Sequence, residues 1–260
     1  MLNYMNAEFY KVFHRKYPYA TFLTFCTLAA LLCSGFIFTN SGGAHNDFQH
    51  GGMSVLMVLS VGLYAALLIC DMVFSDQYKY NTLKNEVSFG VPRPRIYLGK
   101  LAVEAVIGVV MSVLVVVFYE LLCLATLLPC EDPAMTAYTW KVVGYCVLAA
   151  IPQWLAALAL TNMFAFLVKG STLASFVSVG IIAVTPVALE LTALMIWSSA
   201  PHVSDVLLAI RDCLPTQIIS QAPEIAGDWG FIGKSFLTGG VWVAATSAIG
   251  LAVFQRKEIA

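Results

Sequence analysis

The sequence predicts an all-α polytopic membrane protein with six transmembrane helices, and three observations carry this prediction. The 260 residues are 60% hydrophobic and 11% charged, whereas an ordinary globular domain has roughly 45–50% apolar and about 25% charged residues. The charges gather between apolar stretches of about 20 residues, the length at which a helix crosses a bilayer core. The 14 basic and 15 acidic residues nearly cancel, so no basic surface for nucleic acid is indicated.

Six apolar stretches justify the six spans, and together they form one transmembrane domain over 1–260. The spans are 20–38, 53–74, 101–128, 142–168, 173–197 and 235–254. The basic stretch before the first span resembles the start of a signal peptide, but the apolar run is too long for cleavage, so we interpret it as a retained span. The longest gap, 198–234, is too short for an independent catalytic domain. Any energy-coupling enzyme must therefore be a separate chain.

The distribution of Lys and Arg predicts that both termini are cytoplasmic. With the N-terminus inside, the cytoplasmic side holds Lys11, Arg15, Lys16, Lys79, Lys84, Arg93, Arg95, Lys100, Lys169, Arg256 and Lys257. The other side holds only Lys141, Arg211 and Lys234. Cytoplasmic loops retain the excess of positive charge, so this orientation is favoured.

The N-terminal stretch 6–19 combines aromatic and basic residues, including Phe9, Lys11 and Phe13. This composition predicts an amphipathic helix at the membrane interface, with aromatic side chains in the lipid headgroups and basic ones in water. A short disordered tail with anchoring charges is the alternative.

The connection 75–98, between the second and third spans, predicts a short cytoplasmic helix. Tyr80, Leu83 and Val87 share one helical face, and Gly90, Pro92 and Pro94 end the helix. Such a helix can offer apolar anchors to a partner's groove. The alternative is a solvated basic loop that only sets topology.

Catalytic and metal-binding motifs are missing from the sequence. All four histidines lie outside the spans, and no H-E-x-x-H pair is present to hold zinc. The segment 227–235 resembles a phosphate-binding loop, but its first glycine is displaced by one position. We therefore expect no catalytic residue, metal or cofactor in this chain. Cys130 and Cys213 fall in predicted external loops, where they form either a disulfide or two free thiols.

Several short motifs, in this order around six spans, resemble the membrane subunits of ATP-binding-cassette exporters of the type-two permease class, found in bacterial bacteriocin, toxic-peptide and drug efflux. They are E-F-Y-K at Glu8–Lys11, the acid Asp71, Y-N-T-L-K from Tyr80 to Lys84, P-R-P-R-I-Y-L-G-K from Pro92 to Lys100, and F-Q-R-K-E-I from Phe254. The family usually has a small polar residue before its arginine, so either Arg93 or Arg95 can be the equivalent residue.

The resemblance implies a permease in the bacterial cytoplasmic membrane that pairs with a separate ATPase. Two ATPase copies and two permeases, either identical or paralogous, would form the working unit, with ATP and Mg²⁺ bound in the ATPase. The 75–98 segment would be the coupling helix, with Tyr80, Leu83, Lys84, Val87, Arg93 and Arg95 as coupling residues. The N-terminal helix, with Glu8, would be the connector. Spans two and five would line the pathway, and the segment 198–234 would form an external cap over it.

Two helical stripes on those spans are compatible with a pathway. The stripe on span two includes Met53, Met57, Ser60 and Tyr64. The stripe on span five includes Ser175, Ser178 and Thr185. Flexible Met and amphipathic Tyr suit a tolerant ligand surface. Small polar residues also let helices pack closely in lipid, so close packing is the alternative. Glu190 follows Pro186 by four residues and is expected to lie at an external gate.

The expected function is ATP-driven export, with an amphipathic antimicrobial or toxic peptide as the leading substrate class. Export of a hydrophobic drug or lipid is the alternative within the same family. A secondary transporter or channel is less favoured, because the sequence shows neither an internal repeat nor a midplane ion site. An intramembrane enzyme or a scaffold has no catalytic motif to support it.

Overall fold

The computed structural model describes the backbone of residues 1–79, 82–168 and 171–256. Those parts of the chain are α-helical, apart from short connections and one isolated β-bridge between Asp47 and Leu128. The short helices are α1 (Leu2–Phe13), α5 (Thr82–Ser88), α9 (Pro201–Arg211) and α10 (Pro215–Gln221). The long or paired helices are α2 (Tyr17–Ser41), α3 (Phe48–Val58), α4 (Val61–Lys79), α6 (Arg93–Thr126), α7 (Pro133–Leu167), α8 (Ser171–Ile196) and α11 (Trp229–Arg256).

Five helices in the described residues are long and apolar enough to cross a membrane, and the pair α3–α4 makes a sixth span if it is counted as one. The six predicted spans are thus found in order, which confirms the all-α polytopic fold. Every span begins before its predicted stretch, and the first, second and sixth also end after it. The second span differs in kind, because it bends by 56° between α3 and α4.

The bend in the second span is explained by a close contact with α7. The indole N–H of Trp154 on α7 donates to the Leu59 carbonyl at 3.1 Å, and the Gly62 N–H donates to the same carbonyl at 3.1 Å. A Cβ at Gly62 would lie 2.4 Å from Trp154 Nε1. Only glycine lets the indole approach the break this closely. The continuous stripe from Met53 to Asp71 that a straight helix would present is therefore divided at Leu59 and Ser60.

Helix α7 is the centre of the bundle. It is the most buried of the candidate spans and packs against α11, α4, α6, α8, α10 and α3. Many of its buried residues are small, among them Ala149, Ala150, Ala156, Ala157 and Ala159, which allows backbones to approach closely in lipid. Gln153 of α7 donates to the carbonyl of Ser235 on α11 at 2.8 Å, and the Ser235 hydroxyl donates to the Ala149 carbonyl at 2.7 Å.

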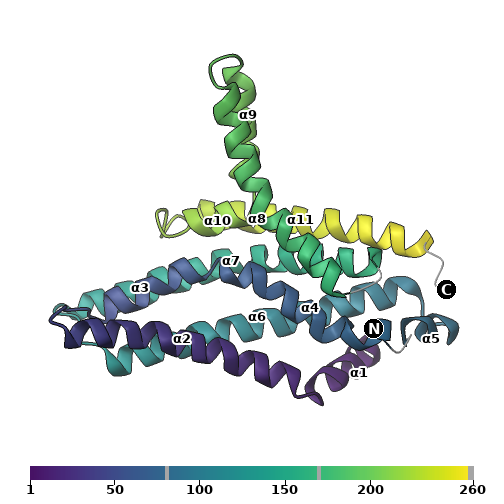
Figure 1. Cartoon of the computed structure of the whole chain (residues 1–260), viewed down its shortest axis with the longest axis horizontal. Helices are drawn as coiled ribbons and strands as arrows, with labels where there is room; N and C mark the ends of the chain where they lie inside the picture. The colour runs from purple at the N-terminus through teal and green to yellow at the C-terminus, as the bar shows by residue number, and fades with distance from the viewer. Residues whose placement is uncertain (80–81, 169–170, 257–260) are drawn as a thin grey trace.

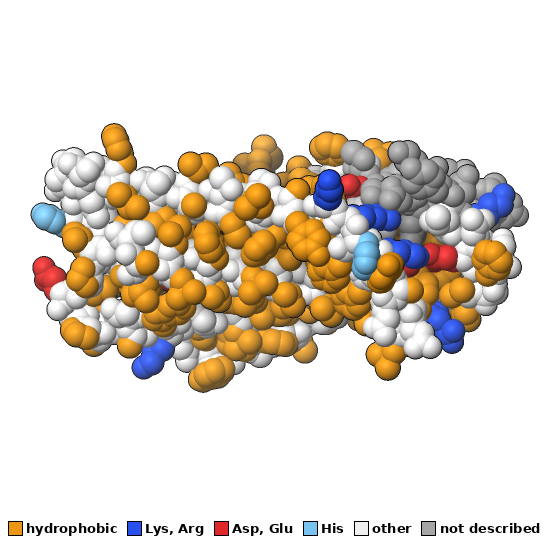
Figure 2. All heavy atoms as spheres, turned by 90° about the horizontal axis from the view of Figure 1, so that it is seen from below, with side chains coloured by type: hydrophobic (Ala, Val, Ile, Leu, Met, Phe, Trp, Pro, Cys, Tyr) orange, Lys and Arg blue, Asp and Glu red, His pale blue; other side chains and the backbone are white. Residues whose placement is uncertain are grey.

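The described termini lie toward the same end of the bundle, beside α1 and α5 (Figure 1). The hairpin of α8 and α9 projects out of the bundle in the same view. Ser204 on α9 donates to the Ala193 carbonyl on α8 at 2.9 Å and joins the two arms. In Figure 2 hydrophobic side chains cover the middle of the visible face, and most of its charged side chains gather toward one end. This distribution fits a membrane-spanning middle and one strongly charged end.

Candidate functional site

The end of the molecule that carries α1 holds a network of charged side chains from three helices. Lys100 of α6 is fully buried, and its ammonium donates to Glu8 Oε2 of α1 at 3.0 Å. Lys11 donates to Glu8 Oε1 at 2.6 Å and to Glu86 of α5 at 3.3 Å. The Tyr4 hydroxyl donates to the other oxygen of Glu86 at 2.9 Å. The network therefore joins the N-terminal helix, the short helix α5 and a membrane span.

The pKa shifts of Glu8 and Lys11 on α1 favour the charged pairs. Burial alone would raise the pKa of the Glu8 carboxyl, but the charges of Lys100 and Lys11 hold it below its ordinary value. Burial would lower the pKa of Lys11, but its hydrogen bond to Glu8 and the neighbouring acids raise it. Burial and the charges of Glu8 and Glu86 raise the pKa of Tyr4, which keeps its hydroxyl a neutral donor.

Helix α1 packs along the start of α6 through both polar and apolar contacts. It spans Leu2–Phe13, so it begins before the predicted 6–19 segment, and α2 already starts at Tyr17. Glu8 and Val12 are buried, Phe9 packs partly buried against the core, and Phe13 is about half exposed. The Tyr4 ring fits over Gly99, where a Cβ would lie only 2.5 Å from the ring.

Helix α5 turns its apolar side inward. Leu83 is 9% exposed and belongs to the main hydrophobic core, and Val87 packs against that core. These two predicted anchors therefore contact their own chain in this structure, and their role in docking the ATPase stays a prediction. Tyr80 lies outside the described residues. The outward side chains are Lys84 and, directly after the helix, Phe89, which is 87% exposed.

Gly90 shapes the outward face of this segment. Its φ is +80°, a left-handed conformation that favours glycine after a helix. Its N–H donates to the Val87 carbonyl at 3.0 Å, and Val91 N–H donates to the Glu86 carbonyl at 3.2 Å. This turn ends α5 and leaves the Phe89 ring in the open.

Arg93 and Arg95 have different surroundings. The Arg93 guanidinium donates to the carbonyls of Phe254 and Gln255 at 2.7 and 2.6 Å and lies over the Phe254 ring. It thus satisfies carbonyls in the last turn of α11, where a positive charge is also favoured by the helix dipole. Arg95 is exposed, so it is the arginine whose side chain is available to a partner.

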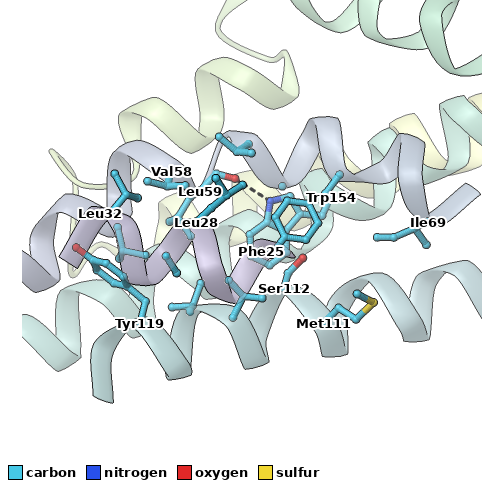
Figure 3. Close-up of a pocket in the computed structure, with 17 residues that line it drawn as sticks. Phe25, Leu28, Leu32, Val58, Leu59, Ile69, Met111, Ser112, Tyr119 and Trp154 are labelled. Carbon is cyan, nitrogen blue, oxygen red and sulfur yellow. Dashed lines mark hydrogen bonds between the residues drawn. The ribbon is translucent and has the colours of Figure 1, made fainter. Parts of the chain in front are cut away.

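An apolar cleft of about 140 Å³ lies between α2, the broken span, α6 and α7. Figure 3 shows Phe25, Leu28 and Leu32 of α2 facing Met111, Ser112 and Tyr119 of α6 across it. Trp154 forms part of its wall, and the dashed line marks the indole bond to Leu59. The described residues that line the cleft include no charged one, so its surface suits hydrocarbon.

The predicted pathway residues do not line this cleft. Met57 is 87% exposed on α3, whereas Met53 and Tyr64 are half-buried and pack against the core, and Ser60 lies at the break. On α8, Ser178 is buried and donates to the Ala174 carbonyl at 2.8 Å, and Ser175 is also buried. Thr185 lines a smaller cavity of about 60 Å³ with residues of α7, α10 and α11. Helices α4 and α8 do pack against each other.

A family model described as "ABC-2 family transporter protein" matches residues 4–185, more than half of the chain. The chain belongs to the ABC-2 transporter family. The match covers the part that runs from α1 into α8 and includes the charged network, α5 and the cleft. No curated protein matches the chain. The protein is thus a multi-pass membrane component of an ATP-binding-cassette transport system, a family whose membrane subunits work with an ATPase.

The connections that were predicted to be external differ partly from expectation. Glu190 of α8 is half exposed and pairs with Arg211 of α9 at 3.4 Å, and Arg211 also pairs with Asp212 at 2.9 Å. The acid therefore joins the two arms of the α8–α9 hairpin.

Cys130 and Cys213 are both free thiols, so the disulfide considered for them is not formed in the structure.

Sequence reasoning missed the most important members of the charged network. It counted Lys100 only as a topology charge and gave no role to Tyr4 or Glu86. A usable signal was present, because Lys100 stands within an apolar helical run that also holds Tyr97 and Val103. A buried lysine in that setting requires an acidic partner. The acid Glu8 on the connector helix was the available partner.

Proposed function

We propose that this chain is the transmembrane half of an ATP-driven exporter in the bacterial cytoplasmic membrane, with both termini cytoplasmic. ATP and Mg²⁺ bind in a separate ATPase, two copies of which work with two permeases. The observation that carries the proposal is the charged network of Tyr4, Glu8, Lys11, Glu86 and Lys100. It connects the segment expected to meet the ATPase to a membrane span, so a push on α5 or α1 reaches α6.

The ATPase docks on the outward side of the α5 segment. Phe89 is a large apolar ring with almost complete exposure at the charged end of the molecule, and Lys84 and Arg95 are exposed in the same stretch of sequence. An aromatic anchor with basic neighbours is typical of an interface hot spot. Leu83 and Val87 support the docking helix from behind.

A second copy of this chain packs on α8. The residues Leu173, Val177, Gly180, Val184, Val187, Leu191 and Leu194 follow one another at alternating four- and three-residue steps. The apolar side chains of this stripe are exposed, from Val177 at 36% to Leu194 at 65%. Such spacing with a small residue in the middle suits helix packing within a membrane.

The substrate is an amphipathic peptide of the antimicrobial or toxic kind. The uncharged cleft and the exposed apolar helices offer surfaces for the nonpolar side of such a peptide. The same uncharged lining also favours the second candidate, a hydrophobic drug or lipid. ATP hydrolysis by the reconstituted complex, measured with amphipathic peptides, hydrophobic cations and phospholipids, separates these two candidates.

Co-purification of the ATPase with a tagged permease tests the docking surface. Phe89→Ala should reduce the recovered ATPase at least about tenfold, since hot-spot aromatic residues contribute about 2 kcal/mol or more. Tyr138→Ala is the matched control, because Tyr138 is also exposed but lies on α7 near the other end of the bundle. Equal ATPase recovery for wild type and Phe89→Ala would contradict this docking surface.

A further inference from the structure

The acid Glu104 lies one helical turn beyond Lys100 on α6, and no contact described above uses it. Its side chain is fully buried, and neither carboxyl oxygen has a hydrogen-bond partner. Residues four apart on a helix are neighbours, with Cβ atoms about 5–6 Å apart. The groups whose charge reaches this carboxyl are Lys100 and Glu8. The Cys70 thiol on α4 lies beside it as a weak donor, and its contact falls short of hydrogen-bond geometry.

A buried carboxylate without hydrogen bonds is far too costly to remain ionised. Lys100 is already paired with Glu8 at 3.0 Å, and Lys11 is shared by Glu8 and Glu86. The two lysines therefore balance the two acids of the network. In this arrangement Glu104 has no charge to neutralise, and it holds its proton as a neutral acid.

The arrangement becomes unstable once α1 moves. Glu8 is the only carboxylate among the described residues within salt-bridge distance of Lys100, and it belongs to α1 rather than to the membrane span. If α1 is displaced, Lys100 keeps its position on α6 and loses its counterion. Water that enters there reaches only the side of the ammonium that α1 covered, while the Phe74 ring of α4 stays on another side. A partly desolvated ammonium is unfavourable without a partner, so a second carboxylate beside Lys100 stabilises the displaced state.

We propose that Glu104 is the alternative counterion of Lys100, and that Lys100 exchanges Glu8 for Glu104 when the ATPase displaces α1. Glu104 then ionises, and its proton leaves to the water admitted where α1 was docked. Glu8 remains ionised because Lys11 stays three residues away on the same helix. Glu104 is thus a positioning residue that stabilises the displaced state. This inference rests on the proposed function and adds a residue to its coupling path.

The test uses the complex of permease and ATPase reconstituted in nanodiscs, with ATP alone as the probe. Glu104→Gln reproduces the shape of the neutral acid but cannot supply a negative charge. We expect the ATPase to co-purify with this variant in wild-type amount while the ATP turnover of the complex falls at least about tenfold, because the displaced state now contains an uncompensated lysine.

Glu120→Gln is the matched control. Glu120 lies on the same helix, is equally buried and also lacks hydrogen-bond partners for both oxygens, but Val116 and Leu124 stand one turn away on either side of it. Its variant should retain turnover within about twofold of wild type.

A second test compares Lys100→Met with the double variant Lys100→Met/Glu104→Gln. Because Glu104 acts through Lys100, the double variant should turn over ATP at the rate of Lys100→Met.

Four results would overturn the inference: wild-type turnover in Glu104→Gln, an equal loss in Glu120→Gln, multiplicative losses in the double variant, or failure of Glu104→Gln to assemble with the ATPase. The last result would show a purely structural role. The proposed function fails in a different way, namely if the wild-type permease neither binds an ATPase nor alters its hydrolysis.

Discussion

The pairing of Glu8 with Lys100 should decide whether α1 stays docked on the bundle. Glu8→Gln preserves the shape of the side chain and removes only its charge, so the docked state loses the buried Lys100–Glu8 ion pair, whereas the detached state, in which Lys100 pairs with Glu104, is unchanged. Breaking a buried pair by removing one partner costs about 3–5 kcal/mol. Glutamine keeps one oxygen acceptor, so we take the lower end, about 3 kcal/mol. At 1.36 kcal/mol per factor of ten, the population with α1 detached should rise about a hundredfold.

Limited trypsin digestion in nanodiscs measures this population. The bond between Lys11 and Val12 is protected while α1 is docked, because Val12 is 1% exposed and Lys11 is held by two acids. When opening and closing are fast relative to cleavage, the cleavage rate follows the open fraction. The rate for Glu8→Gln should therefore rise about a hundredfold over wild type.

Two variants serve as controls for this experiment. Glu131→Gln changes an exposed acid in the connection before α7 and should leave the cleavage rate unchanged. The double variant Glu8→Gln/Lys100→Met removes both charges and should recover most of the protection, because replacing a whole buried pair is often neutral. Cleavage of Glu8→Gln at the wild-type rate would refute the view that this pair holds α1.

Two further predictions concern pH and the bend in the second span. Because the pKa of Glu8 is lowered in the folded protein, its contribution to α1 docking is complete above the ordinary Glu pKa of about 4.3 and is lost as the pH falls through the lower folded value. Trypsin protection should thus be constant from about pH 8 to pH 5, and loss of protection in that range would contradict the assignment. Gly62→Ala places a Cβ 2.4 Å from Trp154 Nε1 and should lower the thermal midpoint by about 2–12 °C, from an overpacking cost of about 1–3 kcal/mol at about 2–4 °C per kcal/mol. Gly144→Ala, where a Cβ meets nothing within 4 Å, should not lower it, and equal midpoints for the two variants would count against the role of Gly62.

The spans were predictable because hydropathy reports a requirement that every membrane helix must meet. A backbone in hydrocarbon has to satisfy its own hydrogen bonds, so apolar stretches of span length are helical almost regardless of their neighbours. The bend between α3 and α4 was not predictable in this way. It depends on Gly62 meeting Trp154, which is 92 residues away in sequence, and neither residue signals a break by itself.

The inward orientation of α5 illustrates a different limit. Helical periodicity placed Leu83 and Val87 on one face, and the structure keeps them together. Periodicity does not tell whether such a face meets the same chain or a partner, because both offer the same apolar environment. The outcome depends on how the turn at Gly90 directs α5 back to the bundle, a tertiary feature that the local pattern does not contain.

The kinds of contact that hold the two ends of α6 suggest why one end can move during a transport cycle. The half of α6 that is far from α1 packs with Cys33, Phe48 and Val55 in a separate apolar cluster, where any displacement opens a void and costs packing energy. The end of α6 beside α1 is joined to it by apolar contacts and by the Lys100–Glu8 ion pair. An ion pair can exchange one carboxylate for another at lower cost than a packed core can rearrange. Regions that move are drawn from the least stable parts of a fold. The charged network is therefore the place where a nucleotide-driven push can change partners without unpacking the membrane span that it moves.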